Sequence, residues 1–302
     1  MSIGTLRQLE YLLAVAETGS ISDAAALVHV SQPTLSQQLK ALEKTVGTPL
    51  LERTPRGAHL TPAGRAFLPG ARQAIEGAQR ATGAARAVAG MVDGQLHLAS
   101  MLSIALGVVP SVLAAWHARH PQVDVVLHEY DGLDSFATAM TEATADVAVG
   151  PLPDAWEGPH HALGAEEFVA ILPPGDPLAG RTTVRPADLA DRRWVQYKQT
   201  HALAGHVERI CTEAGFTPNA VTRSTQTAAI PHLVAAGLGV AIVPANVLTP
   251  DFPGTVLRLT PRHRRRLAVF ARPAPHPLIA EFLAVARTSA RLHPAHLSDL
   301  LG

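Results

Sequence analysis

Residues 30–62 read VSQPTLSQQLKALEKTVGTPLLERTPRGAHLTP. Apolar side chains recur at helical spacing in this stretch, at Leu35, Leu39, Leu42 and Val46. That spacing predicts a helix with one buried face. Ser31 precedes it as a candidate N-cap, and Pro33 stands in the first turn, where a missing N–H costs no hydrogen bond. The stretch therefore predicts a helix from Gln32 to about Val46.

The start of this helix carries short hydrogen-bonding side chains outside its apolar stripe. The candidate DNA contacts are Ser31, Gln32, Pro33, Thr34, Ser36, Gln37 and Lys40. Base edges are read by donors and acceptors of this kind, and the N-terminal residues of a recognition helix enter the major groove first. The alternative is a solvated polar face, which usually favours Glu and Lys. Because Gln, Ser and Thr dominate here, the pattern favours contact with bases.

Two shorter helices precede the candidate recognition helix. Apolar spacing predicts the first from Leu6 to a stop at Gly19, a residue that can take the left-handed conformation of a helix C-terminus. Ser20 or Ser22 then caps a second helix, which is rich in alanine and can approach its neighbour closely. Together with the third helix, these predict a helix-turn-helix unit.

A small hairpin follows the candidate recognition helix. Residues 50–53 and 58–60 read as two short strands, and residues 54–57 form the turn between them. Such a hairpin is typical of a wing. Arg53 and Arg56 lie on or beside it and are candidate contacts to phosphate or to the minor groove.

The order and spacing of these motifs resemble the LysR-type transcriptional regulators. The matching runs are LRQL from Leu6, VSQPTLS from Val30, LLER from Leu50 and LTPAG from Leu60. Gln37 departs from the resemblance, because many members carry Arg there. The resemblance implies a winged helix-turn-helix DNA-binding domain over residues 1–61.

Residues 62–90 predict one long linker helix. An apolar seam with a period near 3.5 runs through Phe67, Ala71, Ala74, Ile75, Ala78, Ala81, Ala85 and Val88. One alternative is a connector that lies on its own chain. The family resemblance implies instead a dimerising helix that holds two winged domains side by side, in a homodimer or homotetramer. Two-fold pairing matches double-stranded DNA with an inverted-repeat promoter site.

From residue 91 the pattern changes to alternating strands and helices, which predicts an α/β domain over residues 91–302. Among the expected elements are a helix over residues 104–120 and strands over residues 168–172, 256–259 and 267–271. The run from Arg262 to Arg266 is interpreted as a solvated strand edge or an extra DNA contact. We expect the tail from Arg291 to be frayed.

This half also resembles the effector-binding domain of the same family, which is similar to periplasmic solute-binding proteins. Its landmarks include DVAVG from Asp146 and VAAGLGVAIVP from Val234. The resemblance implies two α/β subdomains, with crossovers near residues 165–173 and 264–271. The predicted fold class is therefore α + α/β, with a winged helix-turn-helix, a long linker helix and a two-subdomain effector-binding domain.

Candidate effector residues follow the carboxyl ends of the predicted strands, where ligands of open α/β sheets bind. They are Ser100, Met101, Ser103, Tyr130, Gly150, Gln199, Thr200, His201, Thr225 and Gln226. Helix N-termini at such places attract anions, so the effector is predicted to be a small molecule, with an anionic metabolite as one class. Each of these residues can equally serve as a helix cap.

Composition restricts the remaining function classes. The 302 residues carry no net charge, although residues 1–90 hold nine basic and six acidic side chains, which suits an N-terminal nucleic-acid domain. The single cysteine, Cys211, and the lack of a signal or membrane-spanning pattern predict a cytoplasmic protein without membrane contact. The 15 histidines show no metal-ligand spacing, and we expect neither metal nor cofactor. The alternative function is a solute-binding or enzymatic α/β protein with a structural N-terminal module, although no nucleophile motif is present.

Overall fold

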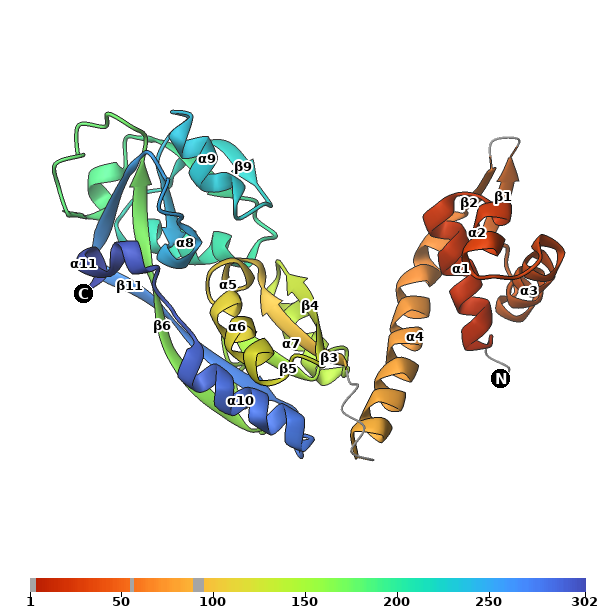
Figure 1. The fold of residues 1–302 in the computed structure, drawn as a ribbon. Coiled ribbons are helices and arrows are strands. Elements are labelled where there is room, and N and C mark those ends of the chain that lie inside the picture. Colours follow the sequence, from red (N-terminus) through yellow and green to blue (C-terminus); the bar gives the residue numbers. More distant parts are fainter. Residues whose placement is uncertain (1–3, 55–56, 89–94) are drawn as a thin grey trace. The chain divides into compact units, whose positions relative to one another are not determined.

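The computed structural model describes residues 4–54, 57–88 and 95–302, and the chain forms two compact units, Met1–Ala85 and Arg86–Gly302 (Figure 1). The first unit contains α1 (Leu6–Thr18), α2 (Ile21–Leu27), α3 (Gln32–Val46), β1 (Leu51–Thr54), β2 (Gly57–Leu60) and α4 (Pro62–Val88). Helix α4 corresponds to the long linker helix predicted over residues 62–90.

The helix boundaries of the first unit are set by local caps. Helix α1 ends at Gly19, whose φ of 67° is left-handed, and Ser20 begins α2 by accepting a hydrogen bond from the Asp23 N–H. Ser31 begins α3 in the same way, by accepting from the Thr34 N–H. The caps at Gly19 and Ser31 were predicted from the sequence and are confirmed, and of the two candidates Ser20 and Ser22 the structure has Ser20 as the cap of α2.

The wing packs against the turn between α1 and α2. Strands β1 and β2 pair antiparallel, and the Ala58 N–H donates to the Gly19 carbonyl at 2.8 Å. Gly57 has a φ of 135°, and a Cβ there would lie 2.4 Å from the same carbonyl oxygen. Glycine at 57 therefore lets the wing approach the helix-turn-helix unit closely. The apolar stripe of α3 (Leu35, Leu39 and Leu42) is buried in the core of this unit.

The second unit alternates strands and helices as the sequence predicted. Its elements are β3 (Gln95–Met101), α5 (Leu102–Gly107), α6 (Val109–Arg119), β4 (Asp124–Tyr130), α7 (Leu133–Thr141), β5 (Val147–Gly150), β6 (His160–Leu172), β7 (Thr183–Val184), η1 (Pro186–Leu189), β8 (Arg193–Tyr197), α8 (Ala202–Glu213), β9 (Asn219–Ser224), α9 (Ala229–Ala235), β10 (Ala241–Pro244), η2 (Ala245–Val247), β11 (Thr255–Ala271), α10 (Pro277–Ser289), η3 (Ala295–Leu297) and α11 (Ser298–Leu301).

Two hydrophobic cores lie within this unit. The main sheet has the order β10-β6-β11-β5-β3-β4, with β7 beside β11, and β8 and β9 form a separate parallel pair. One core gathers β3, β5, α6 and α10 around Trp116 and Phe282, and the other gathers β8, β10, α8 and α9 around Trp194 and Phe168. The long strands β6 and β11 contribute to both regions and join the two halves (Figure 1). The crossovers predicted near residues 165–173 and 264–271 fall on these two strands. The domain limits predicted at residues 61 and 90 remain predictions.

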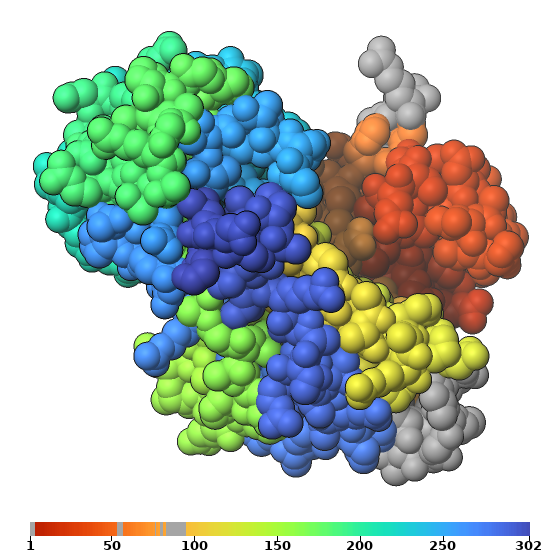
Figure 2. All heavy atoms as spheres, turned by 60° about the vertical axis from the view of Figure 1, so that its left-hand side comes forward, coloured from red at the N-terminus to blue at the C-terminus, as the bar shows by residue number. Residues whose placement is uncertain are grey.

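Three sequence-based expectations for this unit were wrong. The strands expected at residues 256–259 and 267–271 are one strand, β11, because the charged residues between them pair with β6. The helix expected at residues 104–120 is two helices, α5 and α6, which meet at Val108. The tail is folded rather than frayed, because Leu297 and Leu301 are buried in the second core. Figure 2 shows this C-terminal segment, in dark blue, on the surface of the body.

Candidate DNA-binding face and effector site

The predicted DNA contacts occupy one exposed end of α3. The exposed positions are Ser31, Gln32, Pro33, Thr34, Gln37 and Lys40, and Ser36 is half-buried. The hydroxyls of Ser31 and Thr34 lie 2.7 Å apart and hydrogen bond to each other. Gln32, Gln37 and Lys40 are thus the long polar side chains that this end of the helix presents to solvent.

Two contacts hold α3 in place within its unit. The Glu43 carboxylate accepts hydrogen bonds from the N–H groups of Leu50 and Leu51 at 2.9 and 3.0 Å, so the end of α3 is tied to the start of the wing. The Gln8 side-chain amide donates to Gln38 at 3.0 Å and ties α3 to α1. These contacts fix the helix from its buried side and leave its exposed face available.

The two predicted arginine contacts of the wing are described only in part. Arg53 lies on β1, and its side chain lies outside the described part of the chain. Arg56 lies outside the described residues altogether. The hairpin that carries them is present at the predicted place.

The predicted effector residues of the first half cluster at the carboxyl ends of β3, β4 and β5. Ser100 is fully buried, and its hydroxyl donates to the Val149 carbonyl at 3.0 Å, which ties β3 to β5. Met101 is also buried and ends β3. Tyr130 ends β4, and its ring packs edge-on against Phe136, with 6.2 Å between ring centroids.

Gly150 ends β5 in a position that excludes a side chain. A Cβ at this residue would lie 2.5 Å from the Phe136 ring. Glycine therefore lets α7 pack closely over the end of the strand. Ser103, in the first turn of α5, is buried, and its hydroxyl accepts from the Arg265 guanidinium at 3.3 Å.

The predicted effector residues of the second half gather at the start of α8 and before α9. Gln199, Thr200, Thr225 and Gln226 are exposed, whereas His201 is only 3% exposed. The His201 Nδ1 accepts from the Leu203 N–H at 3.1 Å, so its Nε2 carries the proton of the neutral ring and donates to the Thr227 hydroxyl. Burial lowers the pKa of His201, and this effect exceeds the opposing attraction of the Asp131 carboxylate; the Arg265 cation lowers the pKa further. The neutral form is therefore the one present at pH 7.

A backbone contact joins the two groups of effector candidates. The Ala202 N–H, in the first turn of α8, donates to the Asp131 carbonyl just after β4 at 2.6 Å. The predicted loops of the two halves therefore do converge, as expected for strand ends that face one another. The predicted residues contact further side chains that were not singled out in the sequence. Thr227 and Tyr197 contact His201, and Arg265 reaches Ser103 and connects it to Glu166 and Asn246.

A buried polar chain lies at the join of the two halves. Glu166 on β6 is fully buried and forms an ion pair with Arg265 on β11. Its other oxygen accepts from the Asn246 amide at 2.8 Å, while Arg265 reaches Ser103. The opposite charges of residues 166–167 and 262–266 are the sequence signal that would have found this contact, because β6 and β11 align Glu166 with Arg265.

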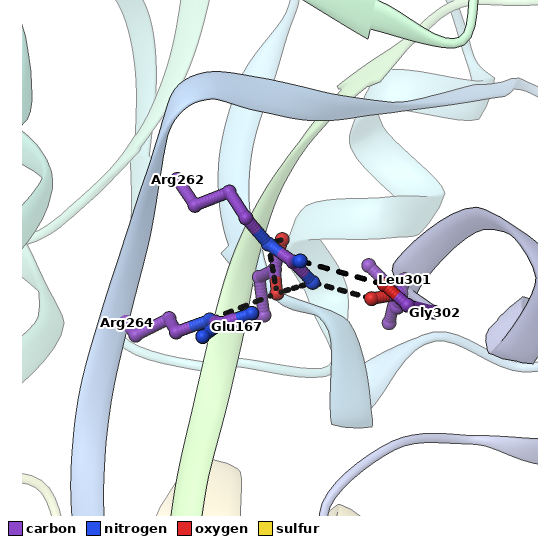
Figure 3. A network of polar contacts seen from close by, with 5 residues as sticks. All are labelled: Glu167, Arg262, Arg264, Leu301 and Gly302. Carbon is purple, nitrogen blue, oxygen red and sulfur yellow. Dashed lines mark hydrogen bonds and ion pairs between the residues drawn. The ribbon is translucent and has the colours of Figure 1, made fainter.

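The neighbouring carboxylate is held by a second pair of arginines. Glu167 is buried and binds Arg262 at 2.6 Å and Arg264 at 3.2 Å, and Arg262 also donates to the C-terminal carbonyls of Leu301 and Gly302 (Figure 3). The Arg262 and Arg264 side chains remain 34% and 49% exposed, so they are solvated as one interpretation of the basic run expected, and they also bind a buried carboxylate. They bind buried carboxylates because β6 places acidic residues directly opposite them.

Two further features concern possible metal ligands and the cysteine thiol. Within residues 4–54, 57–88 and 95–302, no group of three or more His, Cys, Asp or Glu side chains is placed to hold a metal ion. Cys211 is buried in the second core, and burial raises the pKa of its thiol to about 12. In the same ranges, no helix is long and apolar enough to cross a membrane.

Two family descriptions match the chain. Residues 6–65 match "Bacterial regulatory helix-turn-helix protein, lysR family", and residues 89–291 match "LysR substrate binding domain". A probable hydrogen peroxide-inducible genes activator of Mycobacterium avium is 34% identical over 90% of this chain and 85% of its own length. The DNA-binding transcriptional dual regulator OxyR of Escherichia coli K12 is 28% identical over 98% of both chains.

Solved structures agree with these matches. CbnR, a LysR family transcriptional regulator, has a TM-score of 0.75 and 28% identity over 95% of this chain and 99% of its own. CbnR complexed with its target DNA has a TM-score of 0.74 and 28% identity over 95% of this chain and 100% of its own. These findings do not support the alternative of a solute-binding protein or an enzyme. The chain belongs to the LysR family and is a DNA-binding transcriptional regulator with an effector-binding domain.

Proposed function

We propose that this regulator binds an inverted-repeat promoter site as a homodimer or homotetramer, and that a small-molecule effector at the ends of β3, β4 and α8 controls that binding. The observation that carries the effector proposal is the convergence of the predicted loops, where Ala202 meets Asp131. We also propose a cytoplasmic location, because a protein that binds promoters must be in the same compartment as the chromosome.

We propose that Gln32 and Ser36 read bases, together with Thr34 and Gln37, and that Lys40, Arg53 and Arg56 contact phosphates. The exposure of Gln32 and Lys40 on one end of α3 supports this division. Amides and hydroxyls match base edges, whereas a long cation matches the backbone.

A gel-shift titration on the DNA upstream of the protein's own gene tests the division. Gln32→Ala should reduce the preference for that DNA over competitor DNA, whereas Lys40→Ala should weaken both and lower the salt slope by about one. Lys44→Ala, at the exposed far end of α3, is the matched control. Equal behaviour of the Gln32 and Lys40 variants would contradict the assignment, and no preference in the unchanged protein would contradict the promoter proposal.

For the effector, we propose a small molecule that hydrogen bonds near Ser103, His201 and Thr227, with a carboxylate as the anionic class. Arg265 is the cation of this site, and Glu166 already neutralises it. A carboxylate effector must therefore share or displace that ion pair. Thermal-shift titration of the full chain with a small dicarboxylate and with its neutral diamide separates an anionic from a neutral effector. Only the carboxylate can form an ion pair with Arg265, so it should raise the melting temperature more than the diamide.

Peroxide sensing is suggested by the printed names of several relatives, which call those proteins hydrogen peroxide-inducible genes activators. An internal disulfide needs two thiols, and this chain has one cysteine. Cys211 is also buried, with a thiol pKa raised to about 12, so little reactive thiolate forms. We infer that this regulator does not respond to peroxide through Cys211, either by a disulfide within one chain or by another oxidation of this thiol.

A thiol-labelling experiment tests this inference. The native protein, with and without prior hydrogen peroxide, should label slowly with iodoacetamide at pH 8 and rapidly after unfolding in urea. Cys211→Ala should leave promoter binding unchanged in the presence and absence of peroxide. A peroxide response that disappears in this variant would contradict the inference.

A further inference from the structure

A cavity lies beside the C-terminal half of α7, separate from the predicted effector residues. Its volume is about 450 Å³, within the range of roughly 300–1,000 Å³ that is usual for ligand pockets. Its wall comes from within residues 137–141 of α7, residues 153–158 of the loop between β5 and β6, and residues 272–273 after β11. None of the predicted effector residues lines it, so the cavity is a distinct feature of this half of the unit.

The loop that forms one side of this cavity is held in place by its own contacts. The Trp156 indole N–H donates to the Ala271 carbonyl at 3.1 Å, and its ring packs edge-on against Phe270, with 5.1 Å between ring centroids. A Cβ at Gly158 would collide with the same carbonyl oxygen, so glycine lets the loop close against the end of β11. The cavity is therefore formed without a ligand, which lowers the entropic cost of binding one.

The polar side chains on the wall are Thr141, Asp154, Glu157 and Arg272. Asp154 and Glu157 are exposed, and among the described residues neither carboxylate forms an ion pair or a hydrogen bond. Arg272 already faces a carboxylate outside the wall, because its Nη2 lies 3.9 Å from the Asp146 Oδ1. The Thr141 hydroxyl donates to a carbonyl of its own helix and can still accept. The wall therefore offers two uncompensated negative charges.

The remainder of the wall is apolar and suits the body of an organic cation. Its carbon-rich side chains include Ala137, Pro153, Trp156 and Pro273, and Trp156 is only half-buried. Among aromatic side chains, tryptophan attracts a cation to its ring face most strongly. Residues 120–160 contain eight Asp or Glu and no Lys or Arg, so the surrounding field attracts cations and repels anions.

We propose that this cavity is a binding site for an organic amine, with the apolar body against Trp156 and the ammonium group beside Asp154 and Glu157. Because both carboxylates are exposed, the ammonium group keeps part of its hydration, and its transfer from water costs little. The apolar body contributes to binding by leaving water. A neutral molecule of the same shape lacks the ion pairs, and an anion of that shape is repelled by both carboxylates.

Helix α7 connects this cavity with the predicted effector residues. Its C-terminal half lines the cavity, while its Phe136 ring packs against Tyr130 and leaves no room for a side chain at Gly150. An amine in the cavity therefore acts on the helix that covers the ends of β4 and β5. Only this coupling step rests on the proposed function.

Saturation-transfer NMR on the full-length protein tests the site with phenethylamine and phenethyl alcohol, which have the same carbon skeleton and differ in charge. At equal millimolar concentrations and pH 7, the amine should give a signal several-fold stronger than the alcohol, and high salt should reduce this preference. Thr141→Phe, on the cavity wall, should remove the amine signal. Thr138→Phe makes the same substitution at an exposed position of α7 outside the wall and should keep it.

A pair of double variants tests the role of the carboxylates. Asp154→Asn with Glu157→Gln should reduce the amine signal to the level of the alcohol. Asp134→Asn with Glu142→Gln removes the same charge from exposed positions outside the wall and should keep most of the preference for the amine. Equal reduction in both double variants would show a general field effect and would overturn the proposed site.

Several other outcomes would overturn the proposal: no binding of the amine, equal signals from amine and alcohol, or an amine signal retained in Thr141→Phe. Pro273→Phe fills the cavity from another exposed position and replaces Thr141→Phe if that variant does not fold. Weaker self-association of the filled variants, without amine binding to the unchanged protein, would assign the cavity to a second copy of the chain. Because binding is read directly, failure here is distinct from failure to bind promoter DNA.

Discussion

At the scale of single residues, the ion pair of Glu166 and Arg265 has a testable consequence for stability. The Glu166 side chain is fully buried and the Arg265 side chain is 13% exposed. Arg265 also lies over the Phe168 ring, 6.0 Å from its centroid. Desolvation makes each charge dependent on the other, because neither can regain full hydration in the folded state.

Glu166→Gln should therefore lower the free energy of unfolding by about 3 kcal/mol, because Arg265 keeps a buried charge without its counter-ion. Urea denaturation of the full chain measures this loss. Glu17→Gln removes the carboxylate from the exposed ion pair with Arg72 and should cost less than about 1 kcal/mol. If both variants lost equal stability, burial would not be the source of the effect. If the proposed carboxylate effector binds Arg265, it should stabilise Glu166→Gln more than the unchanged protein.

At the scale of elements, α8 carries an acid-sensitive histidine. His206 stacks on Phe168 with 4.1 Å between ring centroids. Burial lowers its pKa to about 4, and the Arg209 cation contributes to the shift. Between pH 6.5 and 4 the unfolded chain binds a proton that the folded His206 does not bind, so the free energy of unfolding falls as pH falls through this window.

His206→Phe should reduce this acid sensitivity by up to about 3 kcal/mol between pH 6.5 and 4, because the ring contact remains and the titrating group is gone. Urea denaturation midpoints at several pH values measure the slope. His117→Phe, which makes the same substitution at an exposed position on α6, is the matched control. If the free energy of unfolding depended on pH as steeply in His206→Phe as in the unchanged protein, His206 would not be the source of the acid sensitivity.

The C-terminal helix α11 is a structural element rather than a loose tail. Leu301 is buried in the second core, and the neighbouring carbonyls accept from Arg262 (Figure 3). Leu301→Ala should lower the free energy of unfolding by about 2–3 kcal/mol through loss of apolar contact. Leu300→Ala, at a half-buried position, should cost about 1 kcal/mol. Equal losses at both positions, measured by urea denaturation, would argue against specific packing of Leu301.

At the scale of the whole molecule, the proposed homodimer would pair through α4. Ala71 and Ile75 on its apolar seam are buried in the core of the first unit, so that part of the seam packs on its own chain. Ala74 and Ala81 on the same seam are exposed. The exposed part is the face that the proposed dimer would use.

Ala74→Glu combined with Ala81→Glu should weaken self-association at least tenfold, about 1.4 kcal/mol, because paired helices would bring carboxylates together. Analytical ultracentrifugation of the full chain measures this change. The matched control is Gln73→Glu with Thr82→Glu, which adds the same charge at exposed positions off the seam. Equal weakening in both double variants would exclude this seam as the interface.

Local signals explain how much of the first unit could be predicted. Ser31 and Gly19 act through hydrogen bonds and backbone conformations within a few residues of themselves, so the sequence predicted the start of α3 and the end of α1. The alternation of strands and helices in the second unit was also predicted from local patterns of apolar residues. The break between α5 and α6 at Val108 was missed, because Pro110 tolerates both one helix with a kink and a new helix start.

The sequence by itself determined the helix-turn-helix, the wing hairpin and the family resemblance, because caps, turns and apolar spacing are local properties. Only the tertiary structure decided which partners the basic residues of β11 bind. Arg265 and Glu166 are 99 residues apart, and they meet because β6 and β11 pair in one register. The two cores set that register by burying the apolar ends of both strands. Arg265, within a basic run that suggested solvent or DNA, thus pairs with a buried carboxylate and connects the halves of the effector-binding domain, while Arg262 and Arg264 stay partly exposed.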